Sequence, residues 1–254
     1  MIPLRDNIPS RTTPVVVYAL IAINVLMFLL QLSAGERFTF SLGVKPGFLL
    51  AWVQGEPATV RQAVHTIYGD RLTLVEVEAT FANTILPFFT SMFLHGGWLH
   101  LGFNMLYLWV FADNIEDQLG RRRFIAFYLL SGIAASAVHV LFDHESVIPT
   151  VGASGAIAGV LGAYIVRFPR ARVLTLIPIF FFIHFVEIPA FFFLGFWFLV
   201  QIFKGLSGTG GNIAVWAHAG GFVAGILLFK LLARSGGAPP GRGPYRDVPF
   251  EVIR

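Results

Sequence analysis

The feature that most constrains the fold of this chain is a series of long apolar segments. A helix needs about 20 residues to cross the roughly 30 Å of hydrocarbon in a bilayer. Hydrophobic residues make up 56% of the 254 residues and charged residues 13%, against about 45–50% and about 25% in soluble domains. The sequence therefore predicts an all-α, integral, multi-pass membrane protein. We expect six transmembrane helices, at Pro14–Leu32, Trp98–Ile115, Phe124–Leu141, Ser154–Val166, Ile183–Phe203 and His218–Leu232.

The basic residues indicate how these helices are oriented. If residues 1–13 lie inside, thirteen of the 18 Lys and Arg residues fall in inner segments and five in outer ones. This asymmetry predicts that both termini are cytoplasmic. The net charge of +4 is then explained by topology, and we expect no nucleic-acid partner. The first apolar run is as long as a span, so we expect a transmembrane helix there and not a cleaved signal peptide. The chain has no cysteine, which excludes disulfides and thiol chemistry.

Composition divides the chain into three parts. Residues 1–13 form a short cytoplasmic segment, 14–234 form the helical core, and 235–254 are rich in Gly, Pro and Arg, which predicts a disordered cytoplasmic tail. Within the core, residues 33–98 are too long for a simple connector and mix aromatic residues with charges and prolines. We expect them to form an outer loop that lies partly in the membrane interface.

The segment 172–203 allows two interpretations. It is interrupted by Pro178, Glu187 and Pro189, so it forms either one span with an interfacial lead-in or two spans. One span is favoured, because a second would place Ser154 and His218 at opposite faces of the membrane.

Two of the expected spans are short. Ser154–Val166 has thirteen residues, about 20 Å of helix, which leaves roughly 10 Å of the membrane uncovered. The helix must begin inside the membrane, and backbone that is not helical at that depth is tolerated only where protein or water surrounds it. We therefore expect the loop through Gly152 to line a wet cavity. His218 begins another short span from the same side, so a serine and a histidine are predicted to start two helices at similar depth.

Small residues favour contact between these two helices. Small side chains on facing helices let the backbones approach closely, which would bring the Ser154 hydroxyl within hydrogen-bond reach of the His218 ring. A serine is a weak nucleophile unless a base takes its proton, and histidine, with a pKa near 6.5, is suited to that role. The Ser154 helix has a face of small residues, at Gly155, Ala158, Gly159 and Gly162. On the other helix, Gly221 and Gly225 lie on the same face as His218.

The stretch FLHGGWLHLGFNM supplies candidates for stabilising an anionic intermediate. His100 and Asn104 are four residues apart, so they share one helix face near the outer end of the second span, and His95 precedes them. Acyl transfer needs hydrogen-bond donors for an oxyanion, and losing one costs about 10²–10³ in rate. The backbone N–H groups of Ser154 and Gly155, at a helix start, are further candidate donors.

These motifs together resemble the rhomboid family of intramembrane serine proteases. They are GASG, AHAGGFVAG, HGGWLHLGFNM and EDQLG, and the resemblance covers Pro14–Arg234. It implies a Ser–His dyad that cleaves transmembrane protein substrates within the bilayer, without metal or cofactor. By motif position, Ser154 would be the nucleophile and His218 the general base. His100 and Asn104 would stabilise the oxyanion, and EDQLG, which begins at Glu116, would make a structural contact at the inner end. Supporting roles are implied for His95, Gly152, Gly155, Gly221 and Gly225. A compact chain without a transit segment is expected in a prokaryotic plasma membrane.

Other interpretations account for some of these residues. A serine beside glycine in a membrane helix is more often a packing residue, and GASGA lacks the second glycine of the hydrolase G-x-S-x-G turn. A zinc site would need His95, His100 and His218, but there is no H-E-x-x-H and no acidic residue beside them. A transporter would be expected to show repeats or several buried charges, and the sequence shows neither.

The main alternative is a catalytically silent rhomboid-like protein that binds or escorts membrane proteins. Such relatives are marked by loss of the Ser or the His, and both are present. The remaining histidines, at 65, 139, 144 and 184, are expected in loops or interfaces.

Overall fold

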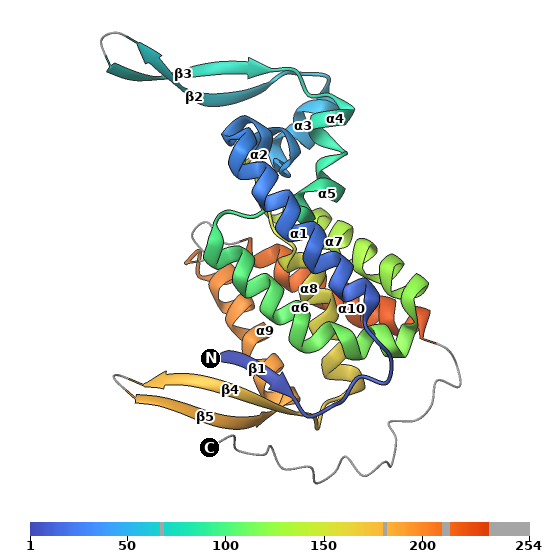
Figure 1. Ribbon diagram of the computed structural model, residues 1–254. Coiled ribbons are helices and arrows are strands. Elements are labelled where there is room, and N and C mark those ends of the chain that lie inside the picture. Colours follow the sequence, from blue (N-terminus) through green and yellow to red (C-terminus); the bar gives the residue numbers. More distant parts are fainter. Residues whose placement is uncertain (67–68, 180–181, 210–213, 234–254) are drawn as a thin grey trace.

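A bundle of six helices forms the body of the protein. The computed structural model describes residues 1–254 except 67–68, 180–181, 210–213 and 234–254. Within the described residues, the helices of 14 or more residues are α1 (Val15–Ala34), α6 (Trp98–Leu119), α7 (Arg121–Phe142), α8 (Ser154–Arg167), α9 (Ala190–Leu206) and α10 (Val215–Leu232) (Figure 1). The predicted helical bundle is confirmed. By length and composition alone, α1, α7 and α10 are long and apolar enough to cross a membrane; the count of six spans stays a prediction.

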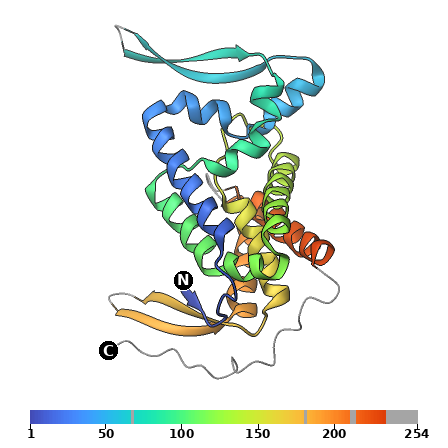
Figure 2. The ribbon, with the colours of Figure 1, turned by 45° about the vertical axis from the view of Figure 1, so that its right-hand side comes forward.

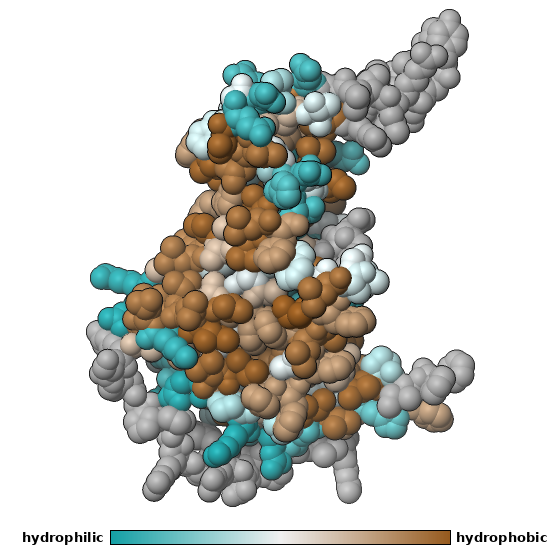
Figure 3. Space-filling model, turned by 180° about the vertical axis from the view of Figure 1, so that it is seen from behind, coloured by the Kyte–Doolittle hydropathy of each residue, from teal (hydrophilic) through white to brown (hydrophobic). Residues whose placement is uncertain are grey.

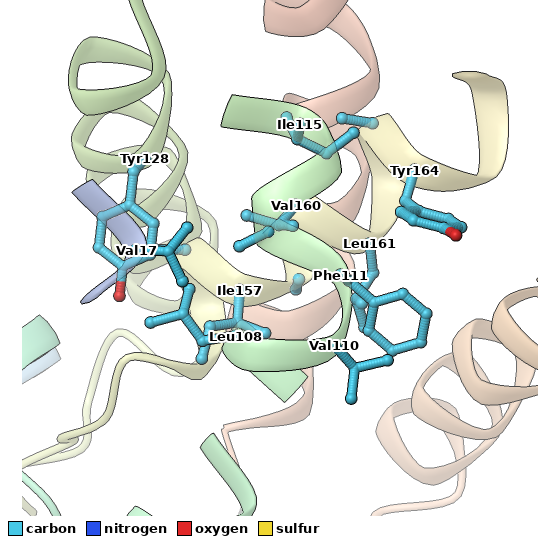
Figure 4. Packing of buried hydrophobic residues seen from close by; sticks show 14 of the residues in the cluster. Val17, Leu108, Val110, Phe111, Ile115, Tyr128, Ile157, Val160, Leu161 and Tyr164 are labelled. Atoms are coloured by element: carbon cyan, nitrogen blue, oxygen red, sulfur yellow. The ribbon is translucent and has the colours of Figure 1, made fainter. Parts of the chain in front are cut away.

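Helix α8 lies at the centre of the bundle. Every residue from Gly155 to Tyr164 is buried, and α8 packs against α6, α7, α9 and α10. Ile157 and Val160 of α8 pack among larger side chains from α6 and α7, including Leu108 and Tyr128 (Figure 4). The central position of α8 fixes its first residue, Ser154, against the surrounding helices.

The outside of the bundle is apolar. Hydrophobic side chains form a broad band across the middle of the face seen in Figure 3, with hydrophilic ones gathered towards the two ends. Large residues such as Leu26, Trp109 and Phe192 are exposed on this exterior. An apolar belt of this size is unfavourable in water and matches the hydrocarbon of a bilayer.

The expected outer loop contains regular structure. Its elements are α2 (Glu36–Leu42), α3 (Pro46–Gln54), the antiparallel hairpin β2 (Ala58–Thr66) and β3 (Gly69–Val77), α4 (Phe81–Thr84), α5 (Pro87–Thr90) and η1 (Ser91–Phe93). Helices α3 and α5 each begin with a proline, whose fixed φ suits a first helical turn. The regular structure of this segment was not predicted, and its place in the interface stays a prediction.

A small sheet lies at the other end of the bundle. Strands β1 (Ile2–Asp6), β4 (Arg172–Ile179) and β5 (Phe182–Pro189) pair antiparallel in the order β1-β4-β5 (Figures 1 and 2). The predicted span Ile183–Phe203 is wrong in its first part, because its first seven residues belong to β5 and helix α9 begins at Ala190. The aromatic and β-branched run favours a strand, and a proline is tolerated only at the start of a helix. One helix with a non-helical lead-in is therefore present. The predicted tail, 235–254, lies outside the described residues.

The motif that begins at Glu116 makes the expected structural contact. The Glu116 carboxylate accepts hydrogen bonds from the backbone N–H groups of Val16, at 3.2 Å, and Val17, at 3.0 Å. These groups belong to the first turn of α1, where no intrahelical acceptor exists and a negative charge is favourable. Glu116 is buried and thereby joins the start of α1 to the end of α6.

Asp6 gives the stability a predictable pH dependence. It accepts hydrogen bonds from the Tyr164 hydroxyl and, at 2.9 Å, from Asn114 Nδ2. Burial outweighs the Tyr164 bond and raises the pKa of Asp6 to about 7 from 3.8. The folded protein binds this proton more tightly than the unfolded chain, so the stabilisation is complete below about pH 4 and is lost as the pH rises through about 7.

We expect the melting temperature of the wild type in detergent to fall further between pH 5 and pH 8 than that of Asp6→Asn, which cannot ionise. The Glu56→Gln variant, at an exposed acidic position, serves as the control. Equal pH slopes for the wild type and Asp6→Asn would contradict the prediction.

Candidate active site

Ser154 and His218 are hydrogen-bonded to each other. The distance from His218 Nε2 to Ser154 Oγ is 2.8 Å, and both residues are half-buried. Ser154 is the first residue of α8, as predicted. The prediction that His218 starts its helix is wrong, since α10 begins at Val215 and His218 lies in the first turn. The two side chains nevertheless meet in the geometry that a nucleophile and its base require.

The small residues of α8 and α10 explain this contact. A Cβ atom on Gly221 would lie 2.1 Å from the Gly155 carbonyl oxygen, and one on Gly225 would lie 2.1 Å from that of Gly159. Both distances are far inside van der Waals contact, so the backbones touch where the side chains are absent. The close approach that the sequence predicts is present, and it sets the distance between Ser154 and His218.

Gln201 of α9 contacts the other nitrogen of the His218 ring. Its Oε1 lies 3.0 Å from His218 Nδ1, while its Nε2 donates to the Trp197 carbonyl oxygen at 3.5 Å. Because an oxygen faces Nδ1, that nitrogen carries the proton and the lone pair of Nε2 faces the Ser154 hydroxyl. The sequence-based prediction missed this residue. A polar side chain within the aromatic run of α9 was the available signal, since such groups in membrane helices are costly.

His100 is oriented as a hydrogen-bond donor near Ser154. The Gly96 backbone N–H donates to His100 Nδ1 at 3.2 Å, so the ring proton resides on Nε2. A Cβ atom on Gly152 would lie 2.9 Å from His100 Nε2 and 3.4 Å from Ser154 Oγ. The φ of Gly152 is 136°, which other residues rarely adopt. Glycine therefore leaves the space between the serine oxygen and the imidazole open.

Asn104 and His95 lie beside His100 in different settings. Asn104 is buried, and its Nδ2 donates to the His100 carbonyl oxygen at 2.9 Å; its role toward an oxyanion stays a prediction. His95 is fully buried, with its ring 5.3 Å from that of His100 in an edge-on arrangement. The Gln31 side chain of α1 accepts a hydrogen bond from the His95 backbone N–H at 3.0 Å and donates one to the His95 carbonyl oxygen at 2.8 Å. The His95 ring therefore packs against His100, while its backbone joins the loop to α1.

The loop that leads into Ser154 is held on two sides. His139 Nε2 lies 2.9 Å from Thr150 Oγ1, and the Gly152 N–H donates to the Ser91 carbonyl oxygen at 2.9 Å. The prediction that His139 lies in a loop or interface is wrong, since it is buried in α7. The non-helical backbone before α8 thus has the partners that such backbone needs inside a bundle.

Comparisons with known proteins agree with this arrangement. The rhomboid domain matches residues 82–235. Rhomboid protein 1, mitochondrial, of Saccharomyces cerevisiae is 31% identical over 160 residues, which are 59% of this chain and 43% of that protein. Presenilin-associated rhomboid-like protein A, mitochondrial, of Danio rerio is 36% identical over 97 residues, 37% of this chain and 25% of that protein. Rhomboid protease GluP of Bacillus subtilis is 35% identical over 154 residues, 59% of this chain and 24% of that protein.

The matched segments span less than half the length of these relatives. Two of their names place them in mitochondria, which argues against the prokaryotic plasma membrane that the sequence predicts; the membrane character of the chain stands. The rhomboid domain covers more than half of the chain and includes α6 to α10. The matched range contains Ser154, His218, His100 and Asn104. The chain therefore belongs to the rhomboid family.

Proposed function

We propose that the protein is a serine endopeptidase that cleaves transmembrane segments of membrane proteins. The observation that carries this proposal is the 2.8 Å contact between His218 Nε2 and Ser154 Oγ inside an apolar helical bundle. The fixed proton on Nδ1 supports it, because it leaves Nε2 free to act as a base. One of the relatives, Rhomboid protease GluP, is a protease by name.

In the proposed acylation step, Ser154 Oγ attacks the carbonyl carbon of the scissile peptide while its proton passes to His218 Nε2. The carbonyl oxygen becomes an oxyanion in the space beside Gly152, where the His100 Nε2–H donates to it. The first N–H groups of α8 lack intrahelical acceptors and are further donors. His218 then gives its proton to the leaving amine, the C–N bond breaks, and an acyl ester remains on Ser154.

Deacylation reverses these roles. His218 takes a proton from a water molecule whose oxygen attacks the acyl carbon, and the second oxyanion uses the same donors. Return of the proton to Ser154 Oγ releases the carboxylic acid and restores the dyad. The proposed substrates are helices that unwind easily, because an intact helix keeps its carbonyl groups in hydrogen bonds. The distribution of basic residues supports placing both termini on the cytoplasmic side.

Cleavage of a single-span reporter tests this function. The wild type, Ser154→Ala and Ser131→Ala would be compared in detergent, together with labelling by a fluorophosphonate probe that reacts with activated serines. Ser131 is the matched control, because it is also buried in the bundle and its hydroxyl has no partner among the described residues. Its loss should leave cleavage and labelling unchanged.

We expect the wild type and Ser131→Ala to cleave and to be labelled, and Ser154→Ala to do neither. Cleavage that survives in Ser154→Ala would overturn the assignment of the nucleophile. A wild type that neither cleaves nor reacts with the probe would favour the silent rhomboid-like protein that binds membrane proteins.

A further inference from the structure

The hairpin of β4 and β5 carries an apolar surface that nothing in the described part of the chain covers. Phe182 is 72% exposed and Phe185 62% exposed, and Ile183 and Val186 are exposed as well. Successive side chains of a strand point to opposite faces, so both faces of β5 present large apolar groups. Figure 1 shows the hairpin extending sideways beyond β1 at the end of the bundle.

The chain continues directly from this surface into the apolar exterior of the bundle. Pro189 ends β5 and α9 begins at the next residue. On α9, Phe192, Phe196 and Phe203 are exposed, and their spacing of four and seven residues places them on one face. That face belongs to the belt that matches bilayer hydrocarbon, and the hairpin extends this apolar surface beyond the first residue of α9.

The free edge of β5 limits how deep the hairpin can lie. In the sheet order β1-β4-β5, the outer edge of β5 has no strand partner among the described residues. Unpaired N–H and C=O groups cost several kcal/mol each in hydrocarbon, so they must remain within reach of water. Exposed Arg170, just before the hairpin, suits phosphate groups, whereas Arg172 is paired with Glu187 of β5 at 3.1 Å. A protein partner would cover one face of the strand, whereas the interface of a bilayer surrounds both.

We propose that the β4–β5 hairpin lies in the headgroup region of the membrane and anchors the N-terminal end of α9. The absence of cysteine from the chain makes the depth measurable, since each introduced cysteine gives a single labelling site. Nitroxide labels would be placed in the full chain at Phe185→Cys, at Phe196→Cys as the hydrocarbon reference, and at Glu145→Cys, an exposed polar position, as the water reference. The protein would be reconstituted in phosphatidylcholine–phosphatidylglycerol bilayers.

Collisions with oxygen, which concentrates in lipid, and with a soluble nickel complex report the depth of each label. We expect the oxygen-to-nickel ratio at Phe185→Cys to be several-fold above that at Glu145→Cys and below that at Phe196→Cys. A ratio equal to that of Glu145→Cys would overturn the proposal, because it would place the hairpin in water. Low collision rates with both reagents would also overturn it, because they would show that protein covers the strand.

A second proposal concerns Gln201 and rests on the proposed function. The Gln201 side chain is buried and bridges His218 Nδ1 and the Trp197 carbonyl oxygen. The Trp197 ring also lies 5.8 Å from the His218 ring. These contacts fix both the rotation of the imidazole and the nitrogen that carries its proton. Among the described residues, Gln201 Oε1 is the hydrogen-bond acceptor that lies against Nδ1.

We infer that Gln201 is a positioning residue that keeps the lone pair of His218 Nε2 directed at Ser154. Gln201→Met has nearly the same length and no hydrogen-bonding amide, and we expect it to lower kcat about 2- to 10-fold, as expected for one net hydrogen bond. The KM should not change, because the contacts of Gln201 are with the Trp197 carbonyl oxygen and with His218 Nδ1, the ring nitrogen that faces away from Ser154. Gln201→Glu should restore kcat, since a carboxyl oxygen again accepts Nδ1–H. Gln54→Met, at an exposed site on α3, is the control.

The outcomes separate this inference from the function on which it rests. A wild type that cleaves while Gln201→Met keeps the same kcat would overturn only the role of Gln201. A loss in Gln201→Met that Gln201→Glu does not restore would show a packing role instead. A wild type that neither cleaves nor reacts with a fluorophosphonate would overturn the protease itself.

Discussion

Replacing His218 by alanine should lower the kcat for cleavage of a transmembrane reporter by about 10⁴-fold or more, the range found when Ser–His enzymes lose their base. The physical reason is the 2.8 Å contact of Nε2 with Ser154 Oγ: without it, the hydroxyl has no acceptor for its proton. Labelling of Ser154 by a fluorophosphonate should slow in parallel. His144→Ala, which removes a largely exposed histidine, should leave both rates unchanged.

The double variant Ser154→Ala/His218→Ala distinguishes a dyad from two independent groups. Residues that act as one unit lose their whole contribution when either is removed, so the double variant should be no less active than Ser154→Ala alone. A double variant that is much less active than each single variant would contradict the dyad, as would full activity in His218→Ala.

Replacing Gly221 by alanine should reduce both stability and cleavage. The new Cβ atom would lie 2.1 Å from the Gly155 carbonyl oxygen, and backbone cannot move aside as a flexible side chain can. Overpacking of this kind costs about 1–3 kcal/mol, occasionally more. Because Gly221 is three residues after His218, separation of α10 from α8 should also move the imidazole from Ser154, and a displacement near 1 Å costs about 10²-fold in rate. The melting temperature and kcat of the purified variant measure these two effects.

Gly195→Ala is the matched control for this prediction. Gly195 also lies in a helix, α9, and a Cβ atom there would meet nothing within 4 Å. It should leave the melting temperature unchanged or slightly raised, since alanine favours a helix more than glycine does. Equal effects of Gly195→Ala and Gly221→Ala would show that helix propensity, and not the contact of α8 with α10, determines the loss.

The helices were predictable because their signal is local. A run of apolar residues at Val15–Ala34 or Arg121–Phe142 indicates a membrane helix whatever surrounds it. The strands were not predicted, because an apolar run such as FIHFVEIP fits either a strand or a membrane helix by hydropathy alone. The pairing of β5 with β4 in a hairpin and of β4 with β1 decided it, and the contact of β4 with β1 joins residues far apart in the sequence.

The sequence by itself determined that this chain is a membrane protein with a serine and a histidine near the starts of two helices and small residues along both helices, because residue type and spacing are read without coordinates. Only the tertiary structure decided which groups complete the site. Gln201 lies 17 residues from His218 and reaches Nδ1 only through the packing of α9 on α10. His139 holds Thr150 across the loop before α8. Hydrogen bonds between separate helices depend on how the helices pack, and periodicity within one helix carries no information on that.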